Sequence, residues 1–502
     1  MPARTLMVQG TASHVGKSVL VAAFCRLFLR QGFRVAPFKA QNMSNNSFVT
    51  PDGLEIGRAQ AVQAAACRLA PRADFNPVLI KPEDERRAQL VVQGRVAGSL
   101  TASDFGRVRR EHSQAIRESF QNLSEEFELV VLEGAGSPAE INLREQDVVN
   151  MRMAKAAKAP VVLVGDIDRG GVFASLVGTL ALLDPDERRH VKGWLINKFR
   201  GDPDVLAPGL RMLEDRMALP CLGVLPLWSD LRVPQEDSLG WEGPASRRTR
   251  RADWLTIGVA DVPVASNVTD FEALLREPDV QMVRLAGETD QPLDALIFPG
   301  TKNTAQALRF VKAKGLDGLA RRMVREGRTV VGICGGYQLL GTHIRDPYGI
   351  ESPEPELEGL GLLDVVTSFA RKKILIQVVG SHRDSGCPIE GYQVHMGRTR
   401  AGRGVRSLLE VQKPGRSMTW SEGAASADGL VVGTYVHGLF DAPAFRRTFL
   451  NRLRARRGWS PLEVQAESTL DQTLDDWADF VARHVDLPAI TGIVERGMGR
   501  HG

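Results

Sequence analysis

The stretch GTASHVGKS, Gly10–Ser18, joins an apolar run that predicts a β-strand (TLMVQG) to an amphipathic run that predicts a helix (SVLVAAFCRLFLRQG). Glycines let the backbone N–H groups of such a loop turn toward a phosphate, and the N-terminus of the next helix adds its positive end. Gly-Lys-Ser at the start of a helix therefore favours a phosphate-binding loop over an ordinary strand-to-helix turn. The glycine spacing is one residue longer than in the common P-loop pattern.

Five residues of this loop have predicted contacts with a nucleotide, for which ATP is the natural candidate. Lys17 would reach the outer phosphates, and the Ser18 hydroxyl would bind Mg²⁺. Gly10, Thr11 and Gly16 would line the phosphate chain.

Apolar runs that predict buried strands alternate with helical stretches on both sides of a polar, Gly- and Pro-bearing segment near residues 234–252. Continuous apolar strands between helices indicate a parallel sheet covered on both faces. We therefore predict an α/β protein with two domains. The predicted divisions are an N-terminal domain over 1–238, a linker over 239–252, a second α/β domain over 253–445 and a helical extension over 446–502.

Two predicted strands of the first domain end in polar residues. Glu133 follows the strand in ELVVLEGAG, at the edge where ligands collect in open α/β sheets, and would complete a Mg²⁺ shell beside a nucleotide. Asn197 ends the strand in GWLINKF, and its amide would read an adenine edge. The structural alternatives are a loop or capping acid for Glu133 and a turn-forming amide for Asn197.

The loop FKAQNMSNNSF, Phe38–Phe48, is dense in amides and hydroxyls. Lys39 would neutralise a transferring phosphoryl group or a substrate carboxylate. Asn42, Asn45 and Asn46 are candidates for binding a polar substrate, although a plain polar loop would have the same composition. Glu55 follows as a candidate second metal ligand.

A cysteine occupies the tightest turn of the second domain, in GICGGYQ. A nucleophile between a strand and a helix needs small neighbours, because the turn is strained and crowded. Cys334 would have its thiolate stabilised by the dipole of the following helix. A buried structural cysteine is the alternative, which the flanking glycines disfavour.

A catalytic thiol also needs a base. His437 ends the strand-like run in GTYVHGLF and is the first candidate, whereas His395, in what we interpret as a β-turn segment, is the second. Gly300, at another strand end, and Gly335, next to the cysteine, would supply N–H groups for an oxyanion. One domain is thus built to activate a group with ATP and the other to form a thioester.

Length and composition exclude several classes of protein. The 502 residues are too many for one core. The net charge is +4, and the densest basic cluster is RRTRR at Arg247–Arg251, which we interpret as a solvated linker, with a nucleic-acid arm as the less favoured alternative. No apolar run is long enough to span a membrane, and no signal peptide is evident. Five scattered cysteines without a CxxC pair favour a reducing, cytoplasmic setting.

The motifs, in their order along the chain, resemble those of the cobyric acid synthases, the glutamine-hydrolysing amidotransferases of cobalamin biosynthesis. The resemblance covers roughly residues 6–440, and its motifs are GTASHVGKS, KAQNMSNNS, EGAGSPAEINL, DIDRGGVFAS, PGTKNT, GICGGYQLLG, EGYQVHMGRT and TYVHGLF. The N-terminal half is similar to the dethiobiotin synthetase type of P-loop fold, which has the same longer glycine spacing. The C-terminal half is similar to a class I glutamine amidotransferase domain.

This resemblance implies amidation of the b, d, e and g carboxylates of adenosylcobyrinic acid a,c-diamide, with glutamine as the nitrogen donor and ATP consumed at each step. Cys334 would be the nucleophile and His437 its base. Lys17, Ser18 and Glu133 would handle phosphates and Mg²⁺, and Lys39 would stand by the acyl phosphate. The expected partners are the corrinoid and glutamine, without nucleic acid or membrane; a homo-oligomer is compatible with the sequence.

One position departs from the wider class I pattern, which places a glutamate two residues after the histidine. This chain has Leu439 at that position. The absence of the glutamate fits the resemblance, since the cobalamin branch has a Cys–His dyad. The sequence leaves open which residue orients His437. Three alternatives remain. The a,c-diamide synthase of the same pathway shares the chemistry, and a partition-type ATPase switch shares the P-loop half. An enzyme that amidates a cell-wall lipid intermediate shares the glutaminase.

Overall fold

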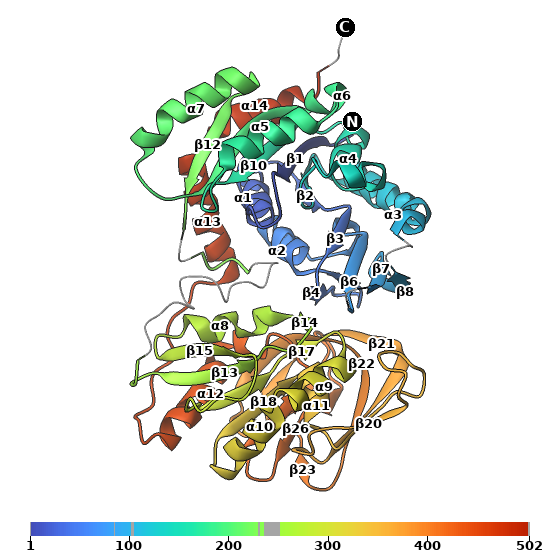
Figure 1. The fold of residues 1–502 in the computed structure, drawn as a ribbon, viewed down its shortest axis with the longest axis vertical. Helices are drawn as coiled ribbons and strands as arrows, with labels where there is room; N and C mark the ends of the chain where they lie inside the picture. The colour runs from blue at the N-terminus through green and yellow to red at the C-terminus, as the bar shows by residue number, and fades with distance from the viewer. Residues whose placement is uncertain (1, 85, 102–104, 229–230, 235–250, 500–502) are drawn as a thin grey trace.

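The computed structural model describes residues 2–84, 86–101, 105–228, 231–234 and 251–499, and these form two α/β units that lie one above the other in Figure 1. Most of the predicted linker at 239–252 lies outside the described residues, as does most of the RRTRR cluster. Within the part of the chain described, no helix combines the length and the apolar character needed to cross a bilayer.

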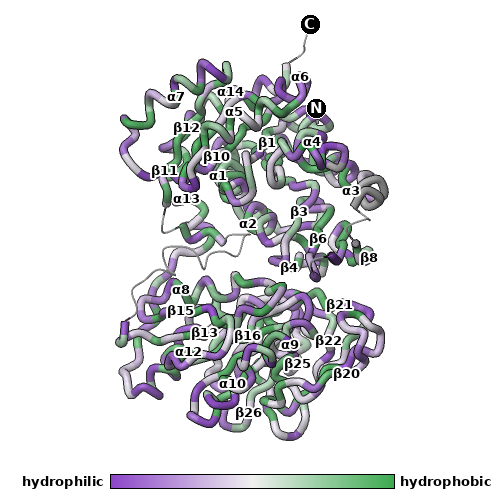
Figure 2. The backbone as a smooth tube through the Cα atoms, in the orientation of Figure 1, coloured by the Kyte–Doolittle hydropathy of each residue, from purple (hydrophilic) through white to green (hydrophobic). Residues whose placement is uncertain are grey.

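The N-terminal unit is built on a six-stranded sheet in which every neighbouring pair is parallel. The strands, in spatial order, are β12 (Cys221–Pro226), β11 (Val191–Phe199), β10 (Val161–Asp166), β1 (Arg4–Gly10), β9 (Leu129–Glu133) and β2 (Val35–Phe38). The residues of β1, β2, β9 and β10 are almost all buried, which confirms the prediction that continuous apolar runs form a sheet covered on both faces. Figure 2 shows the contrast between the hydrophobic β10 and a hydrophilic surface helix, α6 (Pro185–Arg188).

Helices and two small sheets complete this unit. The longer helices are α1 (Lys17–Arg30), α2 (Arg58–Ala66), α3 (Phe105–Glu126), α4 (Met151–Ala156), α5 (Val172–Leu182) and α7 (Pro203–Met217). A four-stranded sheet has the order β3 (Gln41–Met43), β6 (Val78–Pro82), β7 (Arg87–Val92) and β8 (Arg95–Thr101), and a hairpin pairs β4 (Ser47–Val49) with β5 (Glu55–Gly57).

The C-terminal unit repeats the arrangement around a seven-stranded sheet. Its order is β15 (Val280–Leu285), β13 (Leu255–Ala260), β16 (Ala295–Phe298), β18 (Thr329–Ile333), β27 (Val431–Thr434), β26 (Ala424–Ser426) and β23 (Val405–Arg406), of which the first five are parallel. One apolar cluster joins it to α8 (Glu272–Arg276), α9 (Thr304–Ala313), α10 (Leu316–Arg325), α11 (Gly335–Leu340) and α12 (Pro443–Arg456).

A second sheet in this unit contains a long hairpin that reaches the N-terminal unit. The hairpin is formed by β21 (Val365–His382) and β22 (Pro388–Ala401), and the same sheet holds β19 (His343–Arg345), β20 (Glu356–Glu358), β24 (Leu409–Gln412) and β25 (Thr419–Glu422). The interpretation of the segment around His395 as a β-turn is wrong, because His395 pairs with Ile374 within this hairpin. Residues 392–395 of this strand are buried in succession, and the two ends of the strand are more exposed.

Three helices follow the second sheet, and they pack on different units. α12 contributes Leu450 and Leu453 to the C-terminal core. The next two, α13 (Leu470–His484) and α14 (Leu487–Arg496), drawn in red in Figure 1, lie against the N-terminal unit.

Alternate residues of the central strands show how the N-terminal sheet is covered. Leu6 and Val8 of β1 join an apolar cluster that includes residues of α1, α2, α13 and α14. Met7, between them, joins a second cluster with residues of α3, α4, α5 and α7. Since neighbouring side chains of a strand point to opposite faces, the C-terminal helices cover the same face as α1.

Charge and a hydrogen bond fix α13 on α1, the helix that begins at the phosphate-binding loop. The buried Arg26 pairs with Asp471 at 2.6 Å and with Asp475 at 3.2 Å. The indole N–H of Trp477 donates to the carbonyl of Val19 at 2.7 Å. The end of the chain thus supports the start of the nucleotide site.

We expect Trp477→Ala to lower the free energy of unfolding by about 3–5 kcal/mol, because it removes a buried aromatic ring and leaves a cavity against α1. Leu470→Ala on the same helix is the matched control, since Leu470 is 41% exposed and its truncation is expected to cost about 0.5 kcal/mol or less. Denaturant unfolding of both variants would measure the difference, and equal effects would contradict this placement of α13.

Candidate functional site

The predicted phosphate-binding loop connects β1 to α1, as its sequence indicates. Gly16 precedes the helix with a φ of +97°, a conformation that favours glycine. A Cβ on Gly16 would lie 2.3 Å from Nδ2 of Asn197, and one on Gly10 would lie 2.5 Å from the Val15 side chain. Both glycines are therefore required by close packing as well as by the turn.

Lys17, Thr11 and Asn197 hold the loop in place. Nζ of Lys17 donates to the carbonyls of Ala12 at 2.9 Å and Gly136 at 3.1 Å, which places the ammonium group across the loop. The N–H of Thr11 donates to Val164 of β10. Nδ2 of Asn197 donates to the Val15 carbonyl at 2.8 Å, so this amide contacts the loop backbone at the position predicted to read adenine.

Glu133 is the centre of the site, and its carboxylate is 1% exposed. Oε1 accepts from the Ser18 hydroxyl at 2.7 Å and from Nζ of Lys39 at 2.8 Å, and Oε2 accepts from Gln63 at 2.5 Å. Burial opposes ionisation of Glu133, but the charge of Lys39 and these donors outweigh it, and its pKa is lowered. Three residues predicted at the phosphates and metal therefore meet at one carboxylate.

The oxygen atoms of Ser18 and Glu133 suit Mg²⁺, which binds one or two protein oxygens and takes its other ligands from phosphate and water. No cluster of three or more His, Cys, Asp or Glu side chains that could hold a metal occurs among the residues the structure describes. A magnesium ion here would accordingly depend on the nucleotide for most of its ligands.

Glu55 lies elsewhere, at the boundary between the two units. Its carboxylate is fully buried and accepts from Lys81 and, across the boundary, from Lys373 of β21, each at 2.6 Å. Burial opposes ionisation, but the two ammonium groups lower the pKa of Glu55 overall. This pairing disfavours the prediction that Glu55 is a second metal ligand, and it ties the units together.

The three asparagines predicted to bind substrate have different surroundings. Nδ2 of Asn42 donates to Gln60 at 3.1 Å. Oδ1 of Asn46 accepts from the N–H of Val268 at 3.2 Å, so this residue contacts the C-terminal unit. Oδ1 of Asn45 is buried without a hydrogen-bond partner among the described residues, which leaves it as an acceptor for a ligand.

The cysteine of the C-terminal unit has the geometry of a nucleophile elbow. Cys334 follows β18 directly, precedes α11 and has a φ of +52° and a ψ of −108°, which is strained for a residue other than glycine. Its N–H donates to Thr434 of the neighbouring strand β27 at 2.8 Å. The small neighbours are required, since a Cβ on Gly336 would lie 1.9 Å from the Phe298 carbonyl oxygen.

His437 is fully buried, and the charge that orients it comes from a residue that sequence reasoning missed. Nδ1 of His437 is 2.8 Å from Oδ2 of Asp270, and Oδ1 of the same carboxylate accepts from the N–H of Gly438 at 2.9 Å. Nε2 is buried and is the nitrogen left to exchange a proton with the thiol of Cys334, which interacts with this ring. Burial disfavours the imidazolium, but the charges of Asp270 and Cys334 outweigh it and raise the pKa of His437 to about 10.

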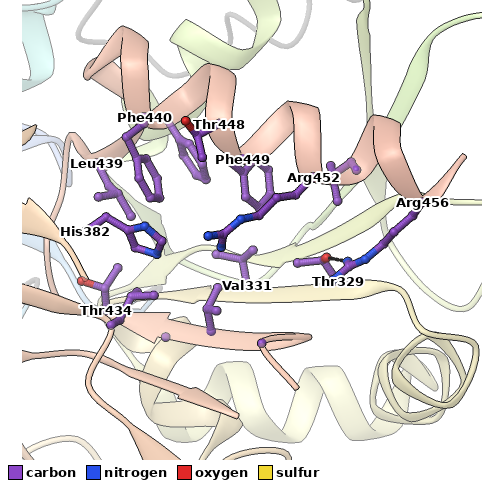
Figure 3. Close-up of a pocket in the computed structure, with 16 residues that line it drawn as sticks. Thr329, Val331, His382, Thr434, Leu439, Phe440, Thr448, Phe449, Arg452 and Arg456 are labelled. Carbon is purple, nitrogen blue, oxygen red and sulfur yellow. Dashed lines mark hydrogen bonds between the residues drawn. The ribbon is translucent and has the colours of Figure 1, made fainter. Parts of the chain in front are cut away.

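Leu439, two positions after His437, has no carboxylate that could orient the histidine. Leu439 lines a largely apolar pocket between the sheet and α12, together with Phe440 and Phe449 (Figure 3). A glutamate in that position would be buried among apolar side chains. Asp270, from the short 3₁₀ turn Val268–Phe271, supplies the carboxylate instead.

The two glycines predicted to hold an oxyanion lie close to the reactive pair. A Cβ on Gly300 would lie 3.3 Å from Cε1 of His437, and one on Gly335 would lie 2.9 Å from the Thr301 backbone nitrogen. Gly335 begins α11, so its N–H belongs to the turn that lacks acceptors within the helix. The two candidate donor segments are therefore adjacent.

His395, the second candidate base, is held differently. Its Nδ1 lies 2.7 Å from the Gly397 carbonyl, and its ring stacks on Tyr435 with centroids 3.6 Å apart. Burial lowers the pKa of His395 to about 3. A neutral ring without a carboxylate neighbour is a weaker partner for a thiolate than His437.

Comparison with known proteins agrees with this division into two sites. Residues 6–239 match the family model of the CobQ/CobB/MinD/ParA nucleotide binding domain, and residues 256–445 match that of the CobB/CobQ-like glutamine amidotransferase domain. A cobyric acid synthase of Dehalococcoides mccartyi is 44% identical to this chain, and the alignment spans 99% of this chain and 100% of that protein. Those of Sorangium cellulosum and Geobacillus thermodenitrificans are 49% and 46% identical, over 91% and 97% of this chain and 92% and 97% of the relatives.

The chain belongs to the cobyric acid synthase family. Its C-terminal unit is a glutamine amidotransferase domain, and its N-terminal unit is a P-loop nucleotide-binding domain, as the sequence predicted.

In this member of the cobyric acid synthase family, the sequence did not predict the ion pair between Asp166 and Lys198 beside the phosphate loop. Asp166 and Asn197 are register partners at the ends of β10 and β11, and Lys198 donates to Asp166 at 2.8 Å and to the His14 carbonyl at 2.7 Å. The signal was present in DID and NKF, because both motifs stand at the ends of predicted strands.

We expect Asp270→Asn to lower kcat for glutamine hydrolysis by about 100-fold or more, since the corresponding change in a Ser-His-Asp enzyme costs about 10⁴-fold. The amide keeps the shape but not the charge that favours the imidazolium. The alkaline limb of kcat/KM, which reports loss of the His437 proton at a pKa of about 10, should move to lower pH.

Rates of glutamate release measured across pH would test this, with ammonia-dependent synthesis as the control, which the variant should leave unchanged. An alkaline limb at the same pH in both proteins would show that Asp270 does not set the charge of His437.

Proposed function

We propose that this protein is a cobyric acid synthase, which amidates the b, d, e and g carboxylates of adenosylcobyrinic acid a,c-diamide with ammonia taken from glutamine. The observation that carries the proposal is the presence, in one chain, of a Cys–His–Asp constellation and a phosphate site centred on Glu133. The names of the relatives, over nearly the full length of this chain, support the choice of substrate.

The N-terminal unit would activate the carboxylate. A carboxylate resists attack by ammonia because oxide is a poor leaving group, and transfer of the γ-phosphoryl group of ATP converts it to an acyl phosphate. Lys17 and Lys39 would stabilise the negative charge of the transferring group, and Mg²⁺ held by Ser18 and Glu133 would supply further positive charge at the phosphates. Asn45 offers a buried acceptor toward the substrate.

The C-terminal unit would release the ammonia. The thiolate of Cys334 attacks the side-chain amide carbon of glutamine, and the oxyanion lies against the N–H groups of Gly300 and Gly335. His437 gives its Nε2 proton to the departing ammonia and then takes a proton from the water that cleaves the thioester. Asp270 keeps the other ring nitrogen protonated and oriented throughout.

Ammonia formed at Cys334 would then pass between the units without entering bulk water, where it would be protonated. A small apolar cluster seals part of the boundary, with Val49 of the N-terminal unit packed on Tyr392 and Val394 of the C-terminal unit. Gln377 donates to the Val49 carbonyl at 2.8 Å beside it. We propose that this closed contact borders the route.

Mass spectrometry of the corrinoid after incubation with ATP, Mg²⁺ and glutamine tests the proposed substrate. We expect four amidation-sized mass shifts on adenosylcobyrinic acid a,c-diamide. Cobyrinic acid is the matched alternative substrate, and two shifts on it with none on the diamide would assign the chain to the earlier a,c-diamide step. ATP hydrolysis without any shift would favour an ATPase switch.

We expect Cys334→Ser to abolish amidation with glutamine and to retain it with ammonium salts, because the thiol acts only in ammonia release. Lys17→Ala should lower both activities by about 10²–10³-fold, since it removes charge stabilisation at the phosphates. Loss of the ammonia-dependent activity in Cys334→Ser would contradict the division into two sites.

A further inference from the structure

The carboxylate that orients His437 lies on a turn that touches the other unit. Asn267 directly precedes the 3₁₀ turn that contains Asp270. Its φ of +51° turns the chain, and its carbonyl accepts from the N–H of Asp270 at 3.0 Å. Any shift of Asn267 would thus be passed directly to Asp270. Asn267 is 1% exposed.

Two reciprocal hydrogen bonds join this turn to the predicted substrate loop of the N-terminal unit. The N–H of Ser47 donates to Oδ1 of Asn267 at 2.9 Å, and the N–H of Val268 donates to Oδ1 of Asn46 at 3.2 Å. We name these four residues the interdomain clasp. Asn46 and Ser47 are as deeply buried as Asn267, so each bond lies in a poorly hydrated contact where a lost partner is costly.

The other side of the clasp leads to the phosphate site. The carbonyl of Asn46 accepts from the N–H of Arg58 at 3.0 Å, and Arg58 is the first residue of α2. Gln60 and Gln63 of α2 both donate to Oε2 of Glu133, at 3.5 and 2.5 Å. A hydrogen-bonded path therefore runs from Glu133, through α2 and the clasp, to Asp270 and His437.

We propose that the interdomain clasp makes glutamine hydrolysis depend on occupation of the N-terminal site, and that Asn267 is a positioning residue acting through Asp270. This inference rests on the proposed function. Nucleotide at Glu133 and substrate at the Asn42–Asn46 loop would bias the position of Asn46 and Ser47. The clasp carries that bias to the carboxylate that sets the charge and orientation of His437.

Asn267→Gly is the sharpest test, because glycine adopts a φ of +51° without strain and only the side-chain acceptor is lost. The measured quantity is the ratio of glutaminase rates with and without ATP, Mg²⁺ and adenosylcobyrinic acid a,c-diamide. We expect this ratio to be about 5–150 in the unaltered protein, the usual range of coupling between two sites, and to approach one in the variant. Asn46→Ala, which removes the other half of the clasp, should lower the ratio as well.

Gln89→Ala is the matched control, since it removes another hydrogen bond between the units, from Nζ of Lys373 to Oε1 of Gln89 at 3.0 Å, without touching the clasp. It should keep the ratio of the unaltered protein. A purely structural clasp would lower stability and leave the ratio unchanged, so an unchanged ratio in Asn267→Gly overturns the proposal. A ratio lost equally in Gln89→Ala also overturns it, because any interface contact would then suffice.

Ammonia-dependent amidation, measured on the same preparations, separates the two levels of inference. Its retention in Asn267→Gly together with a lost ratio supports the clasp. If the unaltered protein has ammonia-dependent amidation but a glutaminase ratio of one, the role proposed for the clasp is overturned and the proposed function stands. Its absence from the unaltered protein overturns the proposed function and the clasp with it.

Discussion

Parallel strands that are buried on both faces bring all of their carboxyl ends to one edge of the sheet, and both sites in this protein follow from that constraint. In the N-terminal unit the edge carries Gly10, Glu133 and Asn197, at the ends of β1, β9 and β11. In the C-terminal unit it carries Cys334 after β18 and His437 shortly after β27. Polar and strained residues can stand there because the apolar strands behind them provide the stability.

Buried charge is used differently at Glu133 and at Glu55. Glu133 is surrounded by donors that a nucleotide and a metal ion could reorganise, so its low pKa keeps an anion ready at the phosphates. Glu55 is held by a lysine from each unit, and burial lowers the pKa of Lys373 to about 7 even beside that carboxylate. Such a pair adds little net stability but penalises every misaligned docking of the units, since a shift would leave a charge buried and unpaired.

The sequence predicted the fold and much of both sites because these depend on local patterns. The strand runs, the helix starts and the glycine-flanked turns around Lys17 and Cys334 could be recognised in the sequence. The structure confirms the two predicted sheets of parallel strands. Asp270 could not be predicted as the partner of His437, because it precedes His437 by 167 residues and no local sequence pattern connects the two. The return of α13 to α1 was also missed, although Asp471, Asp475 and Asp479 recur at every fourth residue and face arginines of α1.

The substitution of Leu439 for the usual glutamate has a structural consequence beyond the loss of one carboxylate. A glutamate two residues after the histidine would move with it, and the reactive pair would be oriented within one strand end. Asp270 instead belongs to a separate turn whose backbone is held by the other unit. Because a histidine needs its carboxylate partner to hold both tautomer and charge, the orientation of His437 depends on how the two units meet. Under the proposed coupling, glutamine would be spared when the acceptor is absent, and Leu439, which lines an apolar pocket, offers no competing carboxylate.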